Sequence, residues 1–386
     1  MAVTVPGPSG SLAPAAGPLR RIPRRGAGLG TALSRRRLEE LLNRLRGLRI
    51  AVVGDFFLDA YYDCDPGLRE ASLETGNTCY QVVRTRRQPG AAGAVAANLA
   101  ALGAGSVHAI GFCGEDGEGW ELRRALEGLC LEMAGFLTAA ARRTPTYGKI
   151  CHVGRDGGRL VLRRELERLD IRNRRRTPPW VQERLAGYLR GSGEWDAVVV
   201  VDQVPDAGCG VVTARMRSCL TDLAEARRER VILVDSRQRL RRFTRLPVKP
   251  NRREAAAALG QPAARSVRAA AMQARQLAAG RRPVFLTLGE RGMVAADPGG
   301  TLHHVAGFPP PSGVPVDPVG AGDSVTAALA CCLAAGASPV EAALAANLAG
   351  SVTVQQIGTT GTASPAQIRR RWREVDGGDG RHGQGR

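Results

Sequence analysis

At 386 residues the chain is long enough for one large or two ordinary domains, and 44% hydrophobic with 24% charged residues is typical of a globular protein with a sizeable core. The net charge of +19 would normally suggest nucleic acid, but almost all the positive charges are arginines scattered along the chain, and aromatic residues, at 4%, are too few for a stacking platform. A nucleic-acid partner is therefore not expected, whereas small acidic substrates would be attracted by the same charge.

The nine cysteines and five histidines predict no zinc site, because no C-x-x-C pair occurs and the cysteine spacings are irregular. Such a pattern is typical of free thiols in a reducing compartment, so we expect a cytoplasmic protein. The two longest apolar stretches, 325–335 and 339–354, are too short or too interrupted to span a bilayer, and no membrane segment is expected.

The first 48 residues resemble an extension ahead of the folded domain. Residues 1–35 are rich in Pro, Gly, Ala and Arg and contain no acidic residue, and no apolar run follows the arginines as it would in a secretory signal. We expect this stretch to be disordered. Residues 36–47 have the pattern of a short amphipathic helix that ends at Gly47.

The first predicted strand, Arg49–Val53, is apolar and leads into Gly54, Asp55 and Asp59, an arrangement typical of the edge of an α/β binding cleft. On its own, Asp59 would be a solvated loop residue. Residues 60–88 and 146–165 alternate apolar and polar side chains without a helical period. They predict further strands, with a hairpin turn at Gly157-Gly158 in the second segment.

A small-residue segment, 89–99, is predicted to open a helix that continues to about Leu102. The chain then alternates short apolar runs with helical segments, which predicts βαβ units and a parallel sheet covered on both faces. The expected strands are Val107–Cys113, Ala197–Val201, Val231–Val234 and Pro283–Leu288, and the expected helices are Glu118–Gly128, Val181–Leu189 and Val211–Arg227.

Asn251 and Glu254 stand three residues apart and share one face of a predicted helix. Taken alone, the pair predicts an N-cap and its capping-box partner. Their side-chain oxygens also suit the waters of Mg²⁺, which keeps much of its hydration shell.

The most informative stretch is Val316–Ser324, which lies between a Pro-rich turn and an apolar run. Gly320 and Gly322 allow a tight turn into a helix, whose first amides and dipole favour an anion. Asp323 is a carboxylate inside that anion hole. Bound phosphate would repel it, so it suits a base that takes the proton of an attacking hydroxyl. The alternative is a plain helix start with Asp323 as the N-cap.

This stretch resembles the signature of the ribokinase-like (PfkB) carbohydrate kinases, Asp-Thr-x-Gly-Ala-Gly-Asp, with Pro318 where Thr is usual. The resemblance covers residues ~49–365 with the order of the motifs preserved. It implies an α/β fold, a three-layer α/β/α sandwich with a small β-sheet lid. The kinase domain would span 49–368, with lid strands at about 60–89 and 146–165 and a basic, Gly-rich tail at 369–386.

Two more stretches carry the resemblance. Segment 89–99 is similar to the second family signature, in which Gly90 and Asn98 match while Ala91 and Ala94 depart from the pattern. Close helix packing through small residues is the alternative for this segment. Gly54-Asp55 with Asp59 is similar to the heptose-phosphate kinase branch of the family, in which the second aspartate holds sugar hydroxyls.

The resemblance assigns a role to individual residues. The catalytic base is Asp323, and the anion hole is lined by Gly320, Ala321 and Gly322; the sugar is held by Asp59, Gly90, Asn98 and Lys149; the nucleotide is held by Asn251, Glu254, Thr287, Gly289, Gly292 and Asn347. It implies ATP and Mg²⁺ as cofactors, with Mg²⁺ held through water by Asn251 and Glu254, and a monovalent cation such as K⁺ near Asp317 and residues 358–361. For Asn347, a role in helix packing is the alternative.

The implied reaction moves the γ-phosphoryl group of ATP to a hydroxyl of a sugar or sugar phosphate, with a heptose 7-phosphate as the expected acceptor. Relatives in this branch carry a nucleotidyltransferase domain with His-x-Gly-His, which this sequence lacks, so adenylyl transfer is not expected. A homodimer through the lid is expected by analogy.

Two alternatives remain open: a kinase of the same fold for ribose, a hexose, a hexose phosphate or a nucleoside, and a sugar or nucleotide sensor that does not catalyse. The sequence has no Walker P-loop, and no Gly-x-Gly-x-x-Gly follows the first strand. A P-loop kinase and a nicotinamide-dependent oxidoreductase are therefore disfavoured.

Overall fold

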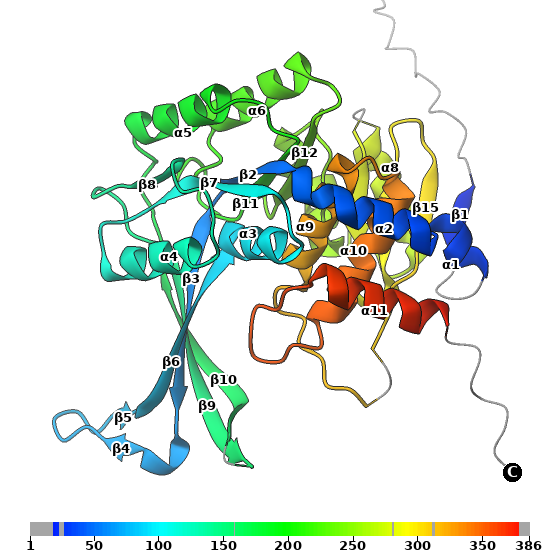
Figure 1. Ribbon diagram of the computed structural model, residues 1–386. Coiled ribbons are helices and arrows are strands. Elements are labelled where there is room, and N and C mark those ends of the chain that lie inside the picture. The colour runs from blue at the N-terminus through cyan, green and yellow to red at the C-terminus, as the bar shows by residue number, and fades with distance from the viewer. Residues whose placement is uncertain (1–17, 23–26, 158, 280–281, 311–312, 378–386) are drawn as a thin grey trace, which may run out of the picture.

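The computed structural model of the chain describes residues 18–22, 27–157, 159–279, 282–310 and 313–377. They form a three-layer α/β/α sandwich with a small β-sheet that projects from one side (Figure 1). The predicted fold class is therefore confirmed. Among these residues, no helix is both long and apolar enough to cross a membrane.

The central sheet begins as five parallel strands, whose short apolar runs are buried on both faces. They are β2 (Arg49–Gly54), β7 (Ser106–Cys113), β8 (Phe136–Thr138), β11 (Ala197–Asp202) and β12 (Val231–Ser236), in the order β12-β11-β2-β7-β8. A second part contains β13 (Val284–Thr287), β14 (Met293–Ala296), β15 (Leu302–Val305) and β1 (Leu19–Ile22), in the order β1-β15-β14-β13.

Val248 joins the two parts of the sheet through parallel bridges to Val234 and Val284. A full strand does not form between β12 and β13 because Pro247 and Pro250 lack the N–H groups that its hydrogen bonds would require.

Alternate residues of the central strands face two helical layers. In β2, Ile50 and Val52 belong to one hydrophobic cluster, and Ala51 and Val53 to the other. The first layer contains α2 (Arg35–Arg44), α3 (Ala92–Ala101), α4 (Gly117–Glu127), α9 (Ala321–Ala334), α10 (Pro339–Thr353) and α11 (Pro365–Asp376), and the second contains α5 (Pro179–Gly191), α6 (Ala214–Ala226), α7 (Arg252–Leu259) and α8 (Val267–Ala278). The remaining turns are α1 (Ala27–Ala32), η1 (Leu45–Gly47), η2 (Pro66–Leu68), η3 (Leu240–Arg242) and η4 (Gly289–Arg291).

The lid is a four-stranded sheet in the order β10-β9-β3-β6. Its strands are β3 (Phe56–Cys64), β6 (Val82–Ala91), β9 (Thr146–Asp156) and β10 (Arg159–Ile171), and the short β4 (Glu70–Ala71) and β5 (Thr78–Cys79) lie at its far end (Figure 1). Because β3 follows β2 after only Asp55, one strand of the central sheet runs on into the lid. Asp55 is buried and accepts bonds from the amides of Gln203, Val204 and Val211 at 2.8, 2.9 and 2.7 Å. These bonds fix the point where the lid leaves the body.

The segment 89–91 differs from its prediction. We expected it to open a helix, but it completes β6, because Gly90 pairs with Phe57 and Ala91 with Phe56 in the lid. Ala91, with φ +51°, then makes the turn, and α3 begins at Ala92.

The packed part of the chain is also larger at both ends than the sequence indicated. Within the extension expected to be disordered, Leu19–Ile22 pair in parallel with Leu302–Val305, while residues 1–17 and 23–26 lie outside the described residues. The expected tail from residue 369 is part of α11 as far as Asp376, and residues 378–386 lie outside the described residues. Trp372 is one of the residues that pack α11 against the body: it is 6% exposed, and its indole donates to the Leu33 carbonyl at 3.3 Å.

We predict that Trp372→Ala lowers the free energy of unfolding by about 3–5 kcal/mol, because it leaves a large cavity between α11 and α2. Urea denaturation followed by circular dichroism measures this difference. Arg370→Ala is the matched control, since its side chain is 68% exposed on the same helix, and it should change the free energy of unfolding by less than about 0.5 kcal/mol. Equal stability of the two variants would show that α11 is not part of the cooperative fold.

Candidate active site

Asp323 lies in the first turn of α9, directly after the glycine turn. Gly320 precedes the helix with φ +80°, and a Cβ there would lie 2.8 Å from Cγ2 of Thr360. Glycine is therefore required at this position both for its conformation and for space. The carbonyl of Gly320 accepts the amide of Ser324 at 3.0 Å, which starts the helix.

The anion hole has fewer free amides than predicted. The helix start was expected to offer the four amides of residues 320–323, but the Ala321 amide donates to the Pro318 carbonyl at 3.3 Å and the Asp323 amide to the Gly320 carbonyl at 3.1 Å. Of these four amides, those of Gly320 and Gly322 have no hydrogen-bond partner among the residues that the structure describes. Two free amides at a helix N-terminus still favour an anion.

The ionisation of Asp323 suits a base at neutral pH. Burial raises the pKa of Asp323 to about 7, and the nearby carboxylate of Asp235 contributes to the rise. The positive charges of Lys249 and Arg237 act in the opposite direction. Near pH 7 the group therefore exists in both forms, as a proton acceptor in catalysis requires.

Asp235 and Lys249, which were not among the predicted site residues, lie beside Asp323. The Lys249 ammonium lies 3.0 Å from the Asp235 carboxylate, and both side chains are buried. The hydroxyl of Thr326, on α9, donates to the same carboxylate at 3.1 Å. One signal was available: Asp235 lies at the carboxyl end of a buried parallel strand, where α/β proteins bind ligands.

Asn251 and Glu254 form the capping box that was one of their two predicted roles. The Asn251 side chain accepts the amides of Arg253 and Glu254, and the Glu254 carboxylate accepts the amide of Asn251 at 2.8 Å. Burial and the charge of Asp235 raise the pKa of Glu254, so this carboxylate also belongs to the charged cluster around Lys249. The capping role is confirmed, and the magnesium role stays a prediction.

The carboxylates of Asp235 and Glu254 fit a hydrated Mg²⁺. No three His, Cys, Asp or Glu side chains gather into a metal site among the residues that the structure describes. Asp235 and Glu254 lie close enough for their charges to interact, and carboxylate oxygens are preferred partners of the waters around Mg²⁺.

Three of the predicted nucleotide residues lie at the end of β13 and in or just after the η4 turn. Thr287 ends β13, and its amide and hydroxyl reach the Pro250 carbonyl at 2.9 and 3.4 Å. Gly289 begins the η4 turn with φ +63°, and a Cβ at this position would lie more than 4 Å from every described residue except its chain neighbours. Gly292 has a different reason to be glycine, because a Cβ there would lie 2.1 Å from the Val305 carbonyl oxygen.

Asn347 shows the packing role that the sequence left as its alternative. Its side-chain amide is 8% exposed and donates to the carbonyls of Val305 and Ala306 at 3.2 and 3.1 Å. These bonds hold α10 against the end of β15.

The acceptor side of the site is on the lid. Lys149 on β9 donates to the Tyr61 hydroxyl at 2.9 Å and lies 3.9 Å from the Asp59 carboxylate on β3. A Cβ on Gly90 would lie 3.0 Å from that carboxylate, so glycine leaves room for Asp59. Burial raises the pKa of Asp59, while the charges of Lys149 and Arg168 oppose the shift.

Asn98 makes hydrogen bonds within the protein, and its predicted role in holding the sugar stays a prediction. Asn98 is 1% exposed; its amide donates to the carbonyls of Ala94 and Gly361, and it accepts the Ser324 hydroxyl at 2.6 Å. It therefore joins α3 to the start of α9.

Asp317 lies beside residues 358–361, as the cation prediction requires. Its carboxylate accepts the amides of Gly358 at 2.9 Å and Val319 at 3.0 Å. The structure brings the two loops together, and the cation itself stays a prediction.

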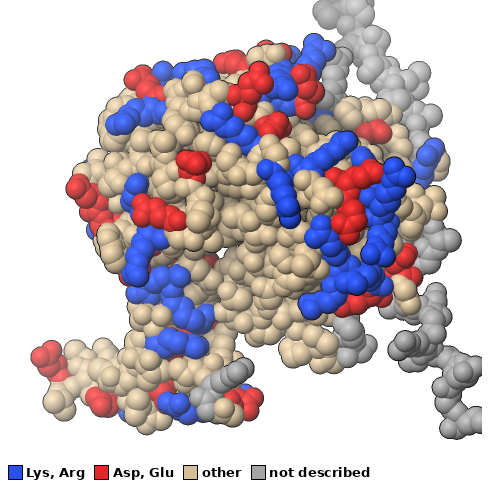
Figure 2. Space-filling model, viewed as in Figure 1, with Lys and Arg blue, Asp and Glu red and all other residues tan. Residues whose placement is uncertain are grey.

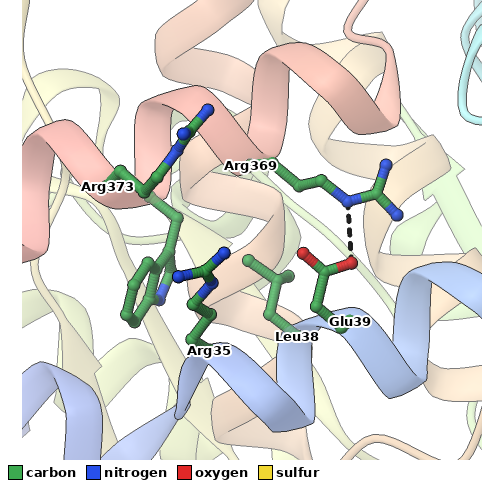
Figure 3. Close-up of a pocket in the computed structure, with 6 residues that line it drawn as sticks. Arg35, Leu38, Glu39, Arg369 and Arg373 are labelled. Carbon is green, nitrogen blue, oxygen red and sulfur yellow. Dashed lines mark hydrogen bonds and ion pairs between the residues drawn. The ribbon is translucent and has the colours of Figure 1, made fainter.

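A cavity of about 150 Å³ lies between α2 and α11 and contains none of these residues (Figure 3). It is lined by Arg35, Leu38, Glu39, Arg369, Trp372 and Arg373, and Arg369 pairs with Glu39 at 2.7 Å. Arg side chains, with Glu among them, gather on this face over α2 and α11 (Figure 2). The chemistry proposed for Asp323 does not involve this cavity.

Comparison with known sequences identifies the family. The pfkB family carbohydrate kinase pattern matches residues 49–367. The bifunctional protein HldE of Trichlorobacter lovleyi is 31% identical over 346 residues, which cover 87% of this chain and 65% of that protein. HldE of Caulobacter vibrioides is 32% identical over 328 residues, which cover 83% and 63%. The chain thus spans slightly less than two thirds of the length of these relatives.

Solved structures share the fold at lower identity. Arabidopsis thaliana ribokinase complexed with ribose and ATP has a TM-score of 0.62 and 17% identity over 84% of this chain and 98% of that one. Escherichia coli phosphofructokinase-2 in complex with potassium has a TM-score of 0.63 and 20% identity over 85% and 99%. Since the family pattern spans most of the sequence, the chain belongs to the pfkB family of carbohydrate kinases, phosphotransferases that act on a sugar hydroxyl.

Proposed function

We propose that this protein transfers the γ-phosphoryl group of ATP to a hydroxyl of a phosphorylated sugar, with a heptose 7-phosphate as the acceptor. The observation that carries the proposal is the position of Asp323, a carboxyl with a pKa near neutrality in the same helical turn as two free amides. An anion hole beside a proton acceptor is what phosphoryl transfer to an alcohol requires.

Charges on and near the lid support a phosphorylated acceptor. Asp59, which is proposed to bind sugar hydroxyls, lies within the electrostatic reach of Lys149, Arg168 and Arg237. Arg168 is paired with Asp170, and Glu165 adds a negative charge, so Lys149 and Arg237 are the groups that would attract the phosphate of the acceptor. The similarity to HldE over most of this chain supports a heptose phosphate as that acceptor.

In the proposed mechanism, Asp59 and Lys149 orient the acceptor so that its hydroxyl lies in line with the phosphoryl group. Asp323 takes the hydroxyl proton as the new oxygen–phosphorus bond forms and the bond to the leaving ADP breaks. The amides of Gly320 and Gly322 donate to the transferring phosphoryl oxygens. When bound, Mg²⁺, held through its waters by Asp235 and Glu254, would offset the phosphate charge.

A different acceptor for the same chemistry is the second candidate. It is favoured by Asn98, which is bonded within the protein, and by Ala91 and Ala94, which depart from the family signature. In both cases, closure of the lid would exclude water and limit hydrolysis of ATP. K⁺ beside Asp317 and a homodimer through the lid are also part of the proposal, by analogy with the family.

We predict that Asp323→Asn lowers kcat by about 10²–10⁴-fold, because the amide cannot accept the hydroxyl proton. The assay is ADP release with Mg-ATP against sugars and sugar phosphates, including heptose 7-phosphate. Asp222→Asn, an exposed change on α6, is the control and should retain full activity. Turnover only with another acceptor would rule out heptose 7-phosphate as the substrate. ATP binding without turnover on any acceptor would instead support a sugar or nucleotide sensor that does not catalyse.

The pH dependence should report Asp323. Because its pKa is raised to about 7, the carboxyl is protonated at lower pH and cannot act as a base. The value of kcat/KM should therefore rise with pH and level off above about 7. Asp235→Asn removes a neighbouring negative charge and should move the midpoint to lower pH. A midpoint near the ordinary value for Asp, about 3.9, would contradict this assignment.

Lys149→Met should raise KM for a phosphorylated acceptor by about tenfold, since it removes one charge-assisted contact but keeps the apolar stem. The KM for ATP and for an unphosphorylated sugar should change much less. Steady-state kinetics with matched sugar and sugar-phosphate pairs measure this. An equal rise for both members of a pair would mean that Lys149 does not recognise phosphate.

A further inference from the structure

One strand of the lid is bonded to the last loop of the body. Arg86, on β6, donates through Nη1 to the Gly358 carbonyl at 2.5 Å. Gln88, two residues along the same strand, accepts the Thr360 amide and the Thr359 hydroxyl, both at 3.2 Å. We call these bonds the lid contact. Neither Arg86 nor Gln88 has a role in the chemistry proposed above.

A buried carboxylate holds Arg86 in place for this contact. Asp63, 0% exposed on β3, accepts Nε and Nη2 of Arg86, each at 2.9 Å. The Arg86 guanidinium also lies over the Tyr61 ring, 4.4 Å from its centroid. Burial alone would raise the pKa of Asp63, but the bonds from Arg86 and Arg84 hold it below its ordinary value. The two bonds to Asp63 and the contact with the Tyr61 ring fix the Arg86 guanidinium so that its Nη1 points at the Gly358 carbonyl.

The loop in turn contacts the start of α9 on both sides of Asp323. Thr360 lies against Gly320, where even a Cβ would be 2.8 Å from its methyl group. The Gly361 carbonyl lies 3.5 Å from the Ser324 hydroxyl. Gly358 also donates its amide to Asp317, three residues before Gly320. A shift of this loop therefore moves the turn that carries the two free amides.

The same lid strand also reaches the acceptor side. In the register of β3 and β6, Gln88 lies directly opposite Asp59, and Arg86 directly opposite Tyr61. Side chains directly opposite each other in antiparallel strands lie on one face of the sheet. The face of the lid that presents Asp59 is thus the face that is bonded to the loop.

We propose that Arg86 and Gln88 are positioning residues. Through the loop 358–361 they fix the position of the turn before Asp323 relative to Asp59 on the lid. This inference rests on the kinase function proposed above. It gives the lid a second role, in which its position sets the geometry of the anion hole as well as that of the acceptor.

Two polar atoms at the lid contact have no hydrogen-bond partner among the described residues. Gln88 Nε2 and Thr360 Oγ1 are buried without a partner in the part of the chain that the structure describes. Buried polar atoms of this kind are uncommon in native proteins, and each would gain a partner if the lid moved or water entered. This suits a contact that breaks and re-forms as substrate enters and product leaves.

The test compares Arg86→Ala and Gln88→Ala with Arg84→Ala. Arg84 is the matched control, because it pairs with the same Asp63 at 2.7 Å, and the bond to the loop comes from Arg86 instead. We expect kcat to fall by about 10–100-fold in Arg86→Ala and in Gln88→Ala, since misplacement of about 1 Å can cost that much. Arg84→Ala should stay within about twofold of the parent. Arg86→Lys keeps the charge but not the fixed fork, and should recover only part of the loss.

Hydrogen exchange of the protein without ATP or sugar gives a readout that does not depend on turnover. The amides of Gly358 and Thr360 should lose protection in Arg86→Ala and Gln88→Ala and keep it in Arg84→Ala. Gln88→Ala leaves the Asp63–Arg86 pair intact. If Arg86→Ala does not fold, Gln88→Ala therefore still tests whether the lid contact holds the loop. Unchanged protection in Gln88→Ala, or equal loss in Arg84→Ala, would overturn the proposal. If the parent protein turns over no acceptor, the kinase function fails, and the exchange comparison still decides whether the lid contact holds the loop.

Discussion

The buried ion pair between Lys249 and Asp235 is the interaction on which the proposed site depends. Removing two charges from water costs several kcal/mol for each ion, and only close pairing with further hydrogen bonds offsets that cost. Here the charges lie 3.0 Å apart, and the Thr326 hydroxyl adds a bond to the carboxylate. The pair fixes the relative positions of three elements: β12, the segment before α7, and α9.

The same pair sets the chemistry of its neighbours. Lys249 lowers the pKa of Asp323 and of Glu254, while Asp235 raises both. Because the two effects oppose each other, this one pair sets how readily Asp323 carries the negative charge that it needs before it accepts a proton. The proposed phosphate side of the site thus belongs to the α/β/α sandwich, whereas Asp59 and Lys149 belong to the lid.

Local patterns were sufficient for much of the fold and for part of the site. The valine run of β11 predicted a strand buried on both faces, and the glycine turn before Asp323 predicted a helix start. The capping box of Asn251 was equally readable, because all its partners lie within three residues.

What could not be predicted depends on contacts between distant segments. Asn98 fits the family signature, yet its amide bonds Gly361 and the Ser324 hydroxyl, which lie far along the sequence. The partner of Lys249 was hidden for the same reason. The strand Leu19–Ile22 contains two arginines among four residues, so its composition did not indicate that it would pair with β15.

That strand has a consequence for the behaviour of the protein in solution. A sheet that ended at β15 would expose a row of unpaired N–H and C=O groups, which is a template for pairing with another chain. β1 covers this row with only four residues, and the two central ones, Arg20 and Arg21, are exposed and positively charged. Short, charged edge strands resist edge-to-edge association. The segment ahead of the kinase domain therefore helps to protect the central sheet against aggregation.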